Sequence, residues 1–311
     1  MARKTKIIVA GIGGVGGYFG GMLAKKYQDS NEVEVDFIAR GEHLKQIQKN
    51  GLKVITKHKT FTAIPAIATD RPEEAGIADY ILICTKSYDL ESVLELLKPC
   101  IDKNTIILPL LNGVDGNEII KKSFPNNIIL NGCVYIISRL KEAGVVENMG
   151  YIQKLYFGLE NTTTDKLMAL ERLLFEADIE VTLSEKIIAI VWEKFLYISP
   201  VATATSYFDN CLGEIREDNY KREMLYQLID EVTEIAFAKD IVTDFEIIMK
   251  IRDKLKLFPY ESTSSMHSDF KALKQHTEIE TLTGYVVREG LKMGIPTPGY
   301  TNIYNELIHK S

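Results

Sequence analysis

A glycine-rich loop near the N-terminus is the first candidate for chemistry. Gly11, Gly13 and Gly16 follow the pattern G-x-G-x-x-G, and glycine lets the backbone approach a pyrophosphate closely. N–H groups at the start of the following helix would hold the phosphates. A glycine-rich turn that binds nothing is the alternative, but an apolar strand precedes this loop and a helical pattern follows it. We therefore expect a dinucleotide to bind Gly11, Ile12, Gly13, Gly14, Val15 and Gly16.

The end of the second expected strand indicates which dinucleotide binds. NAD enzymes place an acid there that accepts hydrogen bonds from the ribose, and counting alone would choose Asp36. Asp36, however, lies inside the strand expected over 33–39, and the strand ends at Arg40. A guanidinium attracts a 2′-phosphate, although a solvent-facing arginine is the alternative. We predict NADP(H), with Lys86 adding positive charge after the strand that ends at Cys84.

Two polar side chains lie where a substrate could meet them. Asn112 follows a buried strand and precedes Gly113. Its amide could donate to a substrate oxygen, whereas an Asn-Gly turn is the simpler interpretation. Lys194 shares an apolar helix face with Val191 and Ile198. A desolvated amine there suits a proton donor, and a lysine whose stem lies along the apolar edge explains the pattern equally well.

The segment 264–280 carries hydroxyls and carboxylates, among them Ser265 and Glu278. Such groups a few turns apart could bind a small polyol or a carboxylate. A serine-rich helix cap followed by a solvated helix start explains the segment as well, and it is the favoured interpretation of this segment taken alone.

Two kinds of pattern position these residues. Strands are expected over 7–10, 33–39, 80–84, 105–111 and 128–134, with a pair of strands within 51–69 and helices between them. This alternation predicts an α/β fold with a Rossmann-type doubly wound parallel sheet. Beyond Ser184 the pattern is helical, over 185–208, 222–239, 245–257 and 277–293. We expect an NADP-binding domain over 1–184 and an all-helical substrate and catalytic domain over 185–311.

Composition narrows the function classes. The 311 residues carry a net charge of -6, which disfavours a nucleic-acid partner. Four cysteines without a C-x-x-C pair indicate reduced thiols in a cytoplasmic protein, and no pattern calls for a metal. No membrane-spanning segment is expected. The amphipathic stretch Tyr300 to Leu307 could dock on its own domain or on a second copy in a homodimer, and we favour its own domain.

Several segments together resemble the ketopantoate reductase (2-dehydropantoate 2-reductase) family over essentially the whole chain. The matching segments are Gly11–Gly17, Phe37–Leu44, Thr85–Asp89, Asn112–Val114, Trp192–Lys194, Ser264–Met266, Thr277–Glu280 and Gly294–Pro298. The resemblance implies reduction of the 2-keto group of ketopantoate by NADPH to give pantoate, on the pathway to pantothenate and coenzyme A.

The resemblance also implies roles for individual residues. Lys194 takes the place of the catalytic lysine, which would protonate the ketone oxygen, and Asn112 would bind that oxygen close to the cofactor. Ser265 and Glu278 would bind the substrate. Lys86 matches a lysine near cofactor and substrate, and Arg40 matches the 2′-phosphate reader.

The chain departs from the family pattern in the substrate pocket. Two asparagine positions of the family fall on Ile198 and Ala202 when the chain is aligned from Lys194 without a gap. One extra residue lies between Ser265 and Glu278. The loss of two amides predicts weaker binding or another small 2-keto acid as substrate.

Two other classes compete with this interpretation. An NADP-dependent 3-hydroxyacid or opine-type dehydrogenase has a similar layout, but the helical half lacks a His–Glu pair. A non-catalytic NADP(H)-binding sensor would bind NADPH without turnover, whereas an enzyme would oxidise it.

Overall fold

The computed structural model describes residues 3–242, 244 and 246–310, and the chain forms two compact units. The first unit comprises the chain up to Leu111 together with Gly116–Ile187, and the second comprises Asn112–Asp115 and the chain from Ile188 onward. The sequence pattern changes near residue 184. The short segment Asn112–Asp115 lies well before that point, yet it also belongs to the second unit. One predicted site residue, Asn112, therefore belongs to the helical unit together with the three residues that follow it, although the chain before and after this segment belongs to the first unit.

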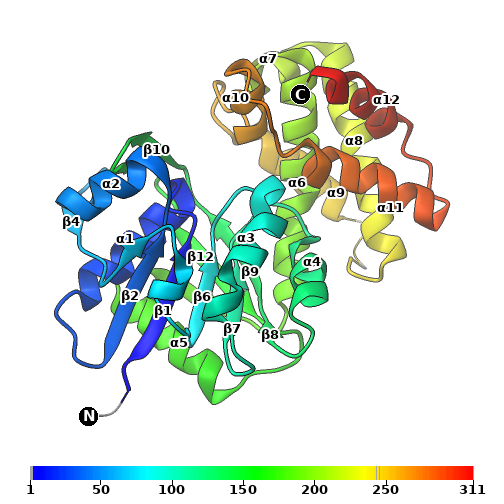
Figure 1. The fold of residues 1–311 in the computed structure, drawn as a ribbon. Helices are drawn as coiled ribbons and strands as arrows, with labels where there is room; N and C mark the ends of the chain where they lie inside the picture. Colours follow the sequence, from blue (N-terminus) through cyan, green and yellow to red (C-terminus); the bar gives the residue numbers. More distant parts are fainter. Residues whose placement is uncertain (1–2, 243, 245, 311) are drawn as a thin grey trace. The chain divides into compact units, whose positions relative to one another are not determined.

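The first unit is built on a six-stranded sheet (Figure 1) with the order β5-β2-β1-β6-β7-β8, in which all neighbouring strands are parallel. Its strands are β1 (Thr5–Ala10), β2 (Val33–Ile38), β5 (Ala68–Thr69), β6 (Tyr80–Ile83), β7 (Ile106–Pro109) and β8 (Ile128–Ile129). The strand order runs outward from β1 in both directions. The predicted α/β fold with a doubly wound sheet is therefore confirmed.

Both faces of this sheet are buried, which explains its continuously apolar strands. Ile7 and Val9 of β1 belong to one core cluster, whereas Ile8 and Ala10 belong to another. Helices α1 (Gly14–Tyr27) and α5 (Asp165–Glu176) supply apolar side chains to the first cluster, and α3 (Leu90–Leu97) and α4 (Gly116–Ser123) to the second. Packing on both faces holds the strands of this sheet in place, and with them the strand ends that precede the candidate site residues.

The single strand predicted over 128–134 is wrong. The chain changes sheets at Leu130, so that β8 belongs to the parallel sheet and β9 (Asn131–Tyr135) to a sheet of order β13-β12-β9. The Leu130 N–H donates to Ile107 O at 2.8 Å, and its side chain is buried. The segment 128–135 thus contributes a strand to each of two sheets, which apolar periodicity alone does not reveal.

Smaller elements complete the first unit. The predicted pair of strands within 51–69 is confirmed as β3 (Leu52–Thr56) and β4 (Thr60–Ala63), which are antiparallel. The remaining elements are α2 (Gly41–Asn50), β10 (Ser138–Glu142), β11 (Val145–Asn148), β12 (Lys154–Gly158), β13 (Glu180–Leu183) and the short turns η1 (Pro72–Glu74), η2 (Ser87–Asp89) and η3 (Lys98–Cys100). Cys84, Cys100, Cys133 and Cys211 form no disulfide among the described residues, and the first three are buried.

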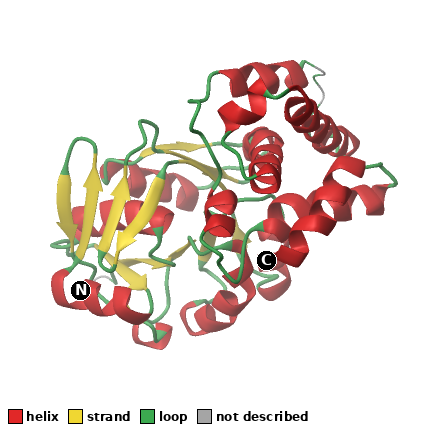
Figure 2. Ribbon diagram, turned by 90° about the horizontal axis from the view of Figure 1, so that it is seen from above, coloured by secondary structure: helices red, strands yellow, loops and turns green. Residues whose placement is uncertain are grey.

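The second unit consists of helices joined by loops (Figure 2). They are α6 (Ile187–Phe208), α7 (Leu212–Glu217), α8 (Asn219–Ala238), α9 (Ile247–Lys256), α10 (Ser265–Lys271), the π-helical turn η4 (Glu280–Gly284), α11 (Tyr285–Met293), α12 (Pro298–Leu307) and η5 (Ile308–Lys310). Phe245, where one of these helices was expected to begin, lies outside the described residues. Tyr300, Ile303 and Leu307 of α12 are buried and α12 packs on α8, so the C-terminal stretch folds back on its own unit as we favoured.

Helix α6 bears on the expectation that the chain has no membrane-spanning segment. Among the described residues it alone is long and apolar enough to cross a membrane by length and composition. Its most apolar window is 56% buried inside the protein. Its Ser199 and Thr203 hydroxyls make hydrogen bonds within the unit, so α6 is the core helix of this unit.

Candidate active site

The glycine-rich loop joins β1 to α1 in the first unit. Gly11 has φ +89°, and a Cβ there would lie 2.7 Å from the Thr85 side chain. A Cβ at Gly16 would lie 2.1 Å from the Gly11 carbonyl oxygen. Helix α1 can therefore start against the loop only if glycine occupies this position.

The same loop fits the phosphates of a dinucleotide. A Cβ at Gly13 would meet nothing within 4 Å, so Gly13 faces open space. Among the described residues, no side chain caps the start of α1, and no acid lies in its first turn. Phosphate oxygens are stabilised at such a helix start. The Ile12 side chain is buried in the core cluster and the partly buried Val15 side chain packs against it, so the backbone of this segment is what the loop offers to a ligand.

Asp36 and Arg40 have different environments. Asp36 is fully buried inside β2, accepts from the Ile67 N–H at 3.0 Å and lies 3.4 Å from the Lys6 ammonium. Burial raises the pKa of the Asp36 carboxyl, and the positive charge of Lys6 opposes this shift. Arg40 lies two residues beyond β2, and its side chain is 84% exposed and 3.2 Å from the Asp89 carboxylate. Asp36 is thus a core residue, and Arg40 is the charged group at the strand end.

Lys86 lies at the same edge of the sheet as the glycine-rich loop. It follows β6, the parallel neighbour of β1, and its side chain is partly buried. The close approach of Gly11 to Thr85 shows that the loops after the two strands are in contact. The first unit therefore gathers the glycine-rich loop, Arg40 and Lys86 at the carboxyl ends of adjacent strands, where ligands bind in such sheets.

The second unit brings four predicted residues into one hydrogen-bonded chain. The Lys194 ammonium donates to Asn112 Oδ1 at 3.1 Å, and Asn112 Nδ2 donates to Glu278 Oε2 at 3.4 Å. Ser265 Oγ donates to the same carboxylate oxygen at 3.4 Å. Glu278 is only 2% exposed. Its buried carboxylate therefore positions the Asn112 amide and the Ser265 hydroxyl, and the Asn112 amide in turn positions the Lys194 ammonium.

Gly113 explains why Asn112 can join the helical unit. Its φ of +95° is a conformation that favours glycine, and a Cβ there would lie 2.1 Å from Thr281 Cγ2. The backbone after Asn112 therefore packs directly on the segment that carries Glu278.

A π-helical turn follows Glu278 and is bonded to α6, the helix of Lys194. Ser199 Oγ donates to Leu282 O at 2.7 Å, and Thr203 and Thr283 share a hydrogen bond of 2.8 Å. These bonds fix the two elements to each other. Helical segments of this type occur frequently at functional sites, and this one sets the distance between Lys194 and Glu278.

Ser265 is the first residue of α10, and its surroundings fix its position. Ser264 caps this helix by accepting from the His267 N–H at 3.0 Å, and it shares a 3.0 Å hydrogen bond with Thr205 of α6. His267 Nε2 lies 2.8 Å from Asp209 Oδ1. The segment therefore does form a serine-rich helix cap, and this cap also places Ser265 beside Glu278.

The face of α6 next to Lys194 is apolar. Ile198 and Val201 follow Lys194 at helical spacing, both are partly exposed, and Thr205 continues the same face. Ala202, by contrast, is buried with 1% exposure. Ile198 and Val201 thus form an apolar stripe on α6 that lies between Lys194 and the Thr205–Ser264 hydrogen bond.

Sequence reasoning missed two groups of residues. Arg288 donates to the Glu280 carboxylate at 2.5 Å and lies 3.9 Å from Asp115, so it ties the Asn112 segment to the π-helical turn. No spacing signal marks Arg288, because Asp115 is distant in the chain and Glu280 lies eight residues earlier, in the π-helical turn that precedes α11. Asp89, the partner of Arg40, did carry a signal, since it follows Lys86 in the loop after β6.

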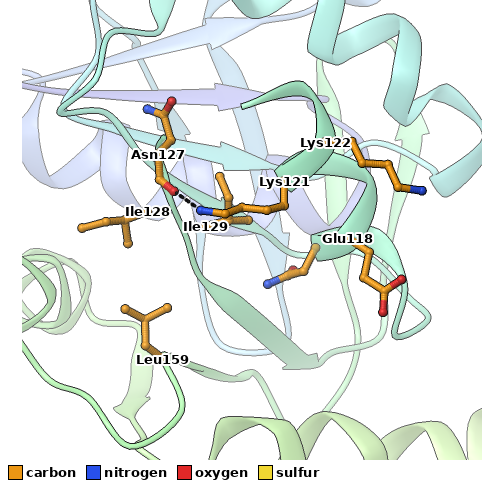
Figure 3. Close-up of a pocket in the computed structure, with 8 residues that line it drawn as sticks. Glu118, Lys121, Lys122, Asn127, Ile128, Ile129 and Leu159 are labelled. Carbon is orange, nitrogen blue, oxygen red and sulfur yellow. Dashed lines mark hydrogen bonds between the residues drawn. The ribbon is translucent and has the colours of Figure 1, made fainter. Parts of the chain in front are cut away.

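A separate hollow of about 680 Å³ lies beside α4 and β8 (Figure 3). Lys121 Nζ donates to Asn127 O at 3.0 Å within it. Its lining contains none of the predicted site residues: it consists of Asn117, Glu118, Lys121, Lys122, Asn127, Ile128, Ile129 and Leu159.

Comparisons with known proteins agree with this architecture. The family model of ketopantoate reductase PanE/ApbA matches residues 7–161, and the model of its C terminal matches residues 186–311. A crystal structure of 2-dehydropantoate 2-reductase from Porphyromonas gingivalis is 37% identical, with a TM-score of 0.86 and coverage of 98% of this chain and 100% of that one.

Two other relatives are oxidoreductases with different names. The uncharacterized oxidoreductase YkpB of Bacillus subtilis is 28% identical over 97% of both chains. A structure of D-mandelate dehydrogenase with NADH and anilino(oxo)acetate is 26% identical, with a TM-score of 0.83 and 98% coverage of both chains. The fold, the two groups of residues and these matches define an oxidoreductase made of an α/β unit and a helical unit. The chain belongs to the ketopantoate reductase family.

Proposed function

We propose that this protein reduces the ketone of 2-dehydropantoate (ketopantoate) to pantoate with NADPH, in the cytoplasm, as a step towards pantothenate and coenzyme A. The observation that carries the proposal is the chain of Lys194, Asn112, Glu278 and Ser265 in a member of this family. Arg40 at the end of β2 supports NADPH over NADH, because a guanidinium binds a 2′-phosphate.

Lys194 supplies the proton in this proposal. The glycine-rich loop would hold a reduced nicotinamide dinucleotide, which would supply a hydride to the ketone carbon, so that negative charge would develop on the ketone oxygen. Lys194 gives a proton to that oxygen and regains one from solvent, so the product is a neutral hydroxyl. The bond from Lys194 to Asn112 Oδ1 directs the ammonium, and the Asn112 amide stabilises the charge before the proton moves.

Ser265 and Glu278 bind the rest of the substrate. The Ser265 hydroxyl donates to the substrate carboxylate, and Glu278 accepts from the substrate hydroxyl. Because Glu278 is buried and already accepts from Asn112 and Ser265, its position is set before the substrate arrives. Such ordering lowers the entropic cost of aligning the ketone.

A second candidate substrate is another small 2-keto acid with a bulkier apolar side chain. The apolar stripe on α6, formed by Ile198 and Val201, favours it, because a ketone at Lys194 and a carboxylate at Ser265 would place the substrate side chain across this stripe. A polar side chain would lose hydration there without gaining a partner. The related D-mandelate dehydrogenase structure holds anilino(oxo)acetate, a 2-keto acid derivative of this bulky kind.

The test is the loss of NADPH absorbance with ketopantoate and with a panel of branched and aromatic 2-keto acids, with NADH in parallel. The proposal expects selective turnover of ketopantoate with NADPH, and faster turnover of a bulkier acid would establish the second candidate. Dinucleotide binding without turnover of any keto acid would overturn both and indicate a sensor.

A further inference from the structure

The charged pair at the end of β2 contains an acid as well as a base. Arg40 Nη2 lies 3.2 Å from Asp89 Oδ2, and the side chains are 84% and 31% exposed. Asp89 approaches from the loop that follows β6, next to Lys86. The guanidinium expected to meet a 2′-phosphate therefore already has a carboxylate partner within the same unit.

The backbone holds Asp89 in this position. Its N–H donates to Lys86 O at 3.0 Å, and its carbonyl accepts from Ser92 Oγ at 2.8 Å. Asp89 is the residue before α3, yet its carboxylate does not cap that helix. The carboxylate contacts Arg40 instead, at the candidate cofactor edge of the sheet.

Two cofactors would experience this carboxylate differently. A 2′-phosphate carries nearly two negative charges near neutral pH, so it must compete with Asp89 for Arg40 and is repelled by it. A ribose 2′-hydroxyl is neutral and can donate to a carboxylate, as it does to the acid that reads NAD. Asp36 cannot take this part, because it is fully buried and held by Ile67 and Lys6.

We propose that Asp89 is a specificity-determining residue that lowers the preference of this site for NADPH over NADH. The inference rests on the proposed function, since it assumes that a nicotinamide dinucleotide binds at the glycine-rich loop. The protein then uses NADPH through Arg40 while Asp89 keeps NADH as an accepted cofactor. This property depends on two exposed or partly exposed side chains, so one substitution can change it without disturbing the core.

The experiment compares wild-type protein with Asp89→Asn by calorimetric binding of NADPH, NADH, adenosine 2′,5′-bisphosphate and adenosine 5′-monophosphate. The last two probes report on the Arg40 end without any turnover. We expect Asp89→Asn to tighten binding of NADPH and of the bisphosphate about tenfold, and to leave or weaken that of NADH and the monophosphate. The gain should shrink as salt is raised, because the pair is near solvent.

The matched control is Glu95→Gln, which removes a carboxylate of α3, the helix that follows Asp89; Glu95 pairs with Lys98. It should leave the NADPH to NADH affinity ratio unchanged. If Asp89→Asn leaves that ratio unchanged, or weakens NADPH, the inference is overturned and Asp89 merely orients Arg40. An unchanged ratio with intact NADPH-dependent turnover overturns the inference alone, whereas a wild-type protein that binds no dinucleotide overturns the proposed function with it.

Discussion

The two groups of candidate residues are built in different ways. At the edge of the parallel sheet, glycines and backbone shape the loop, and six of the predicted residues are consecutive in sequence, Gly11 to Gly16. In the helical unit, four side chains from four distant segments form one hydrogen-bonded chain. A site made by the backbone depends on local conformation, whereas a site made by side chains depends on packing. Substitutions in one group should therefore leave the function of the other group unchanged.

The largest expected effect concerns Lys194. Lys194→Ala removes the proposed proton donor, so kcat should fall between about 10² and 10⁴-fold, while affinity for NADPH stays within about twofold because the glycine-rich loop belongs to the other unit. Steady-state kinetics and calorimetry measure the two quantities. The control is Lys256→Ala, at an exposed lysine of α9 paired with Asp253. Unchanged turnover in Lys194→Ala would remove Lys194 from the mechanism.

At the glycine-rich loop, we expect substitutions to lower the affinity for NADPH. Gly16→Ala places a Cβ 2.1 Å from a backbone oxygen, and the helix start must move, so NADPH affinity should fall at least about tenfold and unfolding should become easier. Gly13→Ala places a Cβ in open space, so it should weaken NADPH binding at nearly unchanged stability. Calorimetry and urea unfolding check both variants. Unchanged NADPH affinity in Gly13→Ala would show that the space before Gly13 is not a phosphate site.

The same contrast explains what the sequence could predict. The alternation of apolar strands and helices predicted the doubly wound sheet, because strands such as β1 are buried on both faces and their apolar runs are continuous. The pattern also placed Arg40 correctly beyond the strand end. It could not separate β8 from β9, since only Leu130 lies between the two strands. It also could not connect Arg288 with Asp115, which lies far away in the chain.

In the helical unit the resemblance supplied what spacing could not. Lys194, Ser265 and Glu278 each had a plain structural explanation when taken alone, and only folding shows that Asn112 joins them. Asn112 also belongs to the helical unit through Gly113, which fits no helix pattern. A chain of side chains is visible in sequence only when the relatives that share it are known.

A smaller effect is expected at Gly113. Gly113→Ala would be strained at φ +95° and would meet Thr281 Cγ2 at 2.1 Å, so Asn112 should shift and kcat should fall about 10 to 100-fold. NADPH affinity should not change. Adding Thr281→Ser removes the clashing methyl but not the backbone strain, so it should restore part of kcat. Full activity in Gly113→Ala would show that the placement of Asn112 is unimportant for the reaction.

The smallest effect concerns packing near Arg40 in the first unit. His43 lies on α2, and its Nδ1 accepts from the Gly144 N–H at 2.8 Å. Burial lowers the pKa of the His43 imidazole from its ordinary value of 6.5. Between that value and the lower folded pKa, the unfolded chain binds more protons than the folded one, so the free energy of unfolding falls as pH falls. Above about pH 6.5 the contribution of His43 is fully present.

Urea unfolding of the whole chain at about pH 7.5 and about pH 5.5 measures this contribution. The variant His43→Gln cannot take up a proton, so its loss of stability between the two pH values should be smaller than that of the wild-type protein by at most about 1.4 kcal/mol. His58→Gln, at an exposed histidine, should keep the wild-type loss. An equal loss in His43→Gln and wild type would show that protonation does not break the contact with Gly144. The pH response of the region around Arg40 would then have to come from other groups.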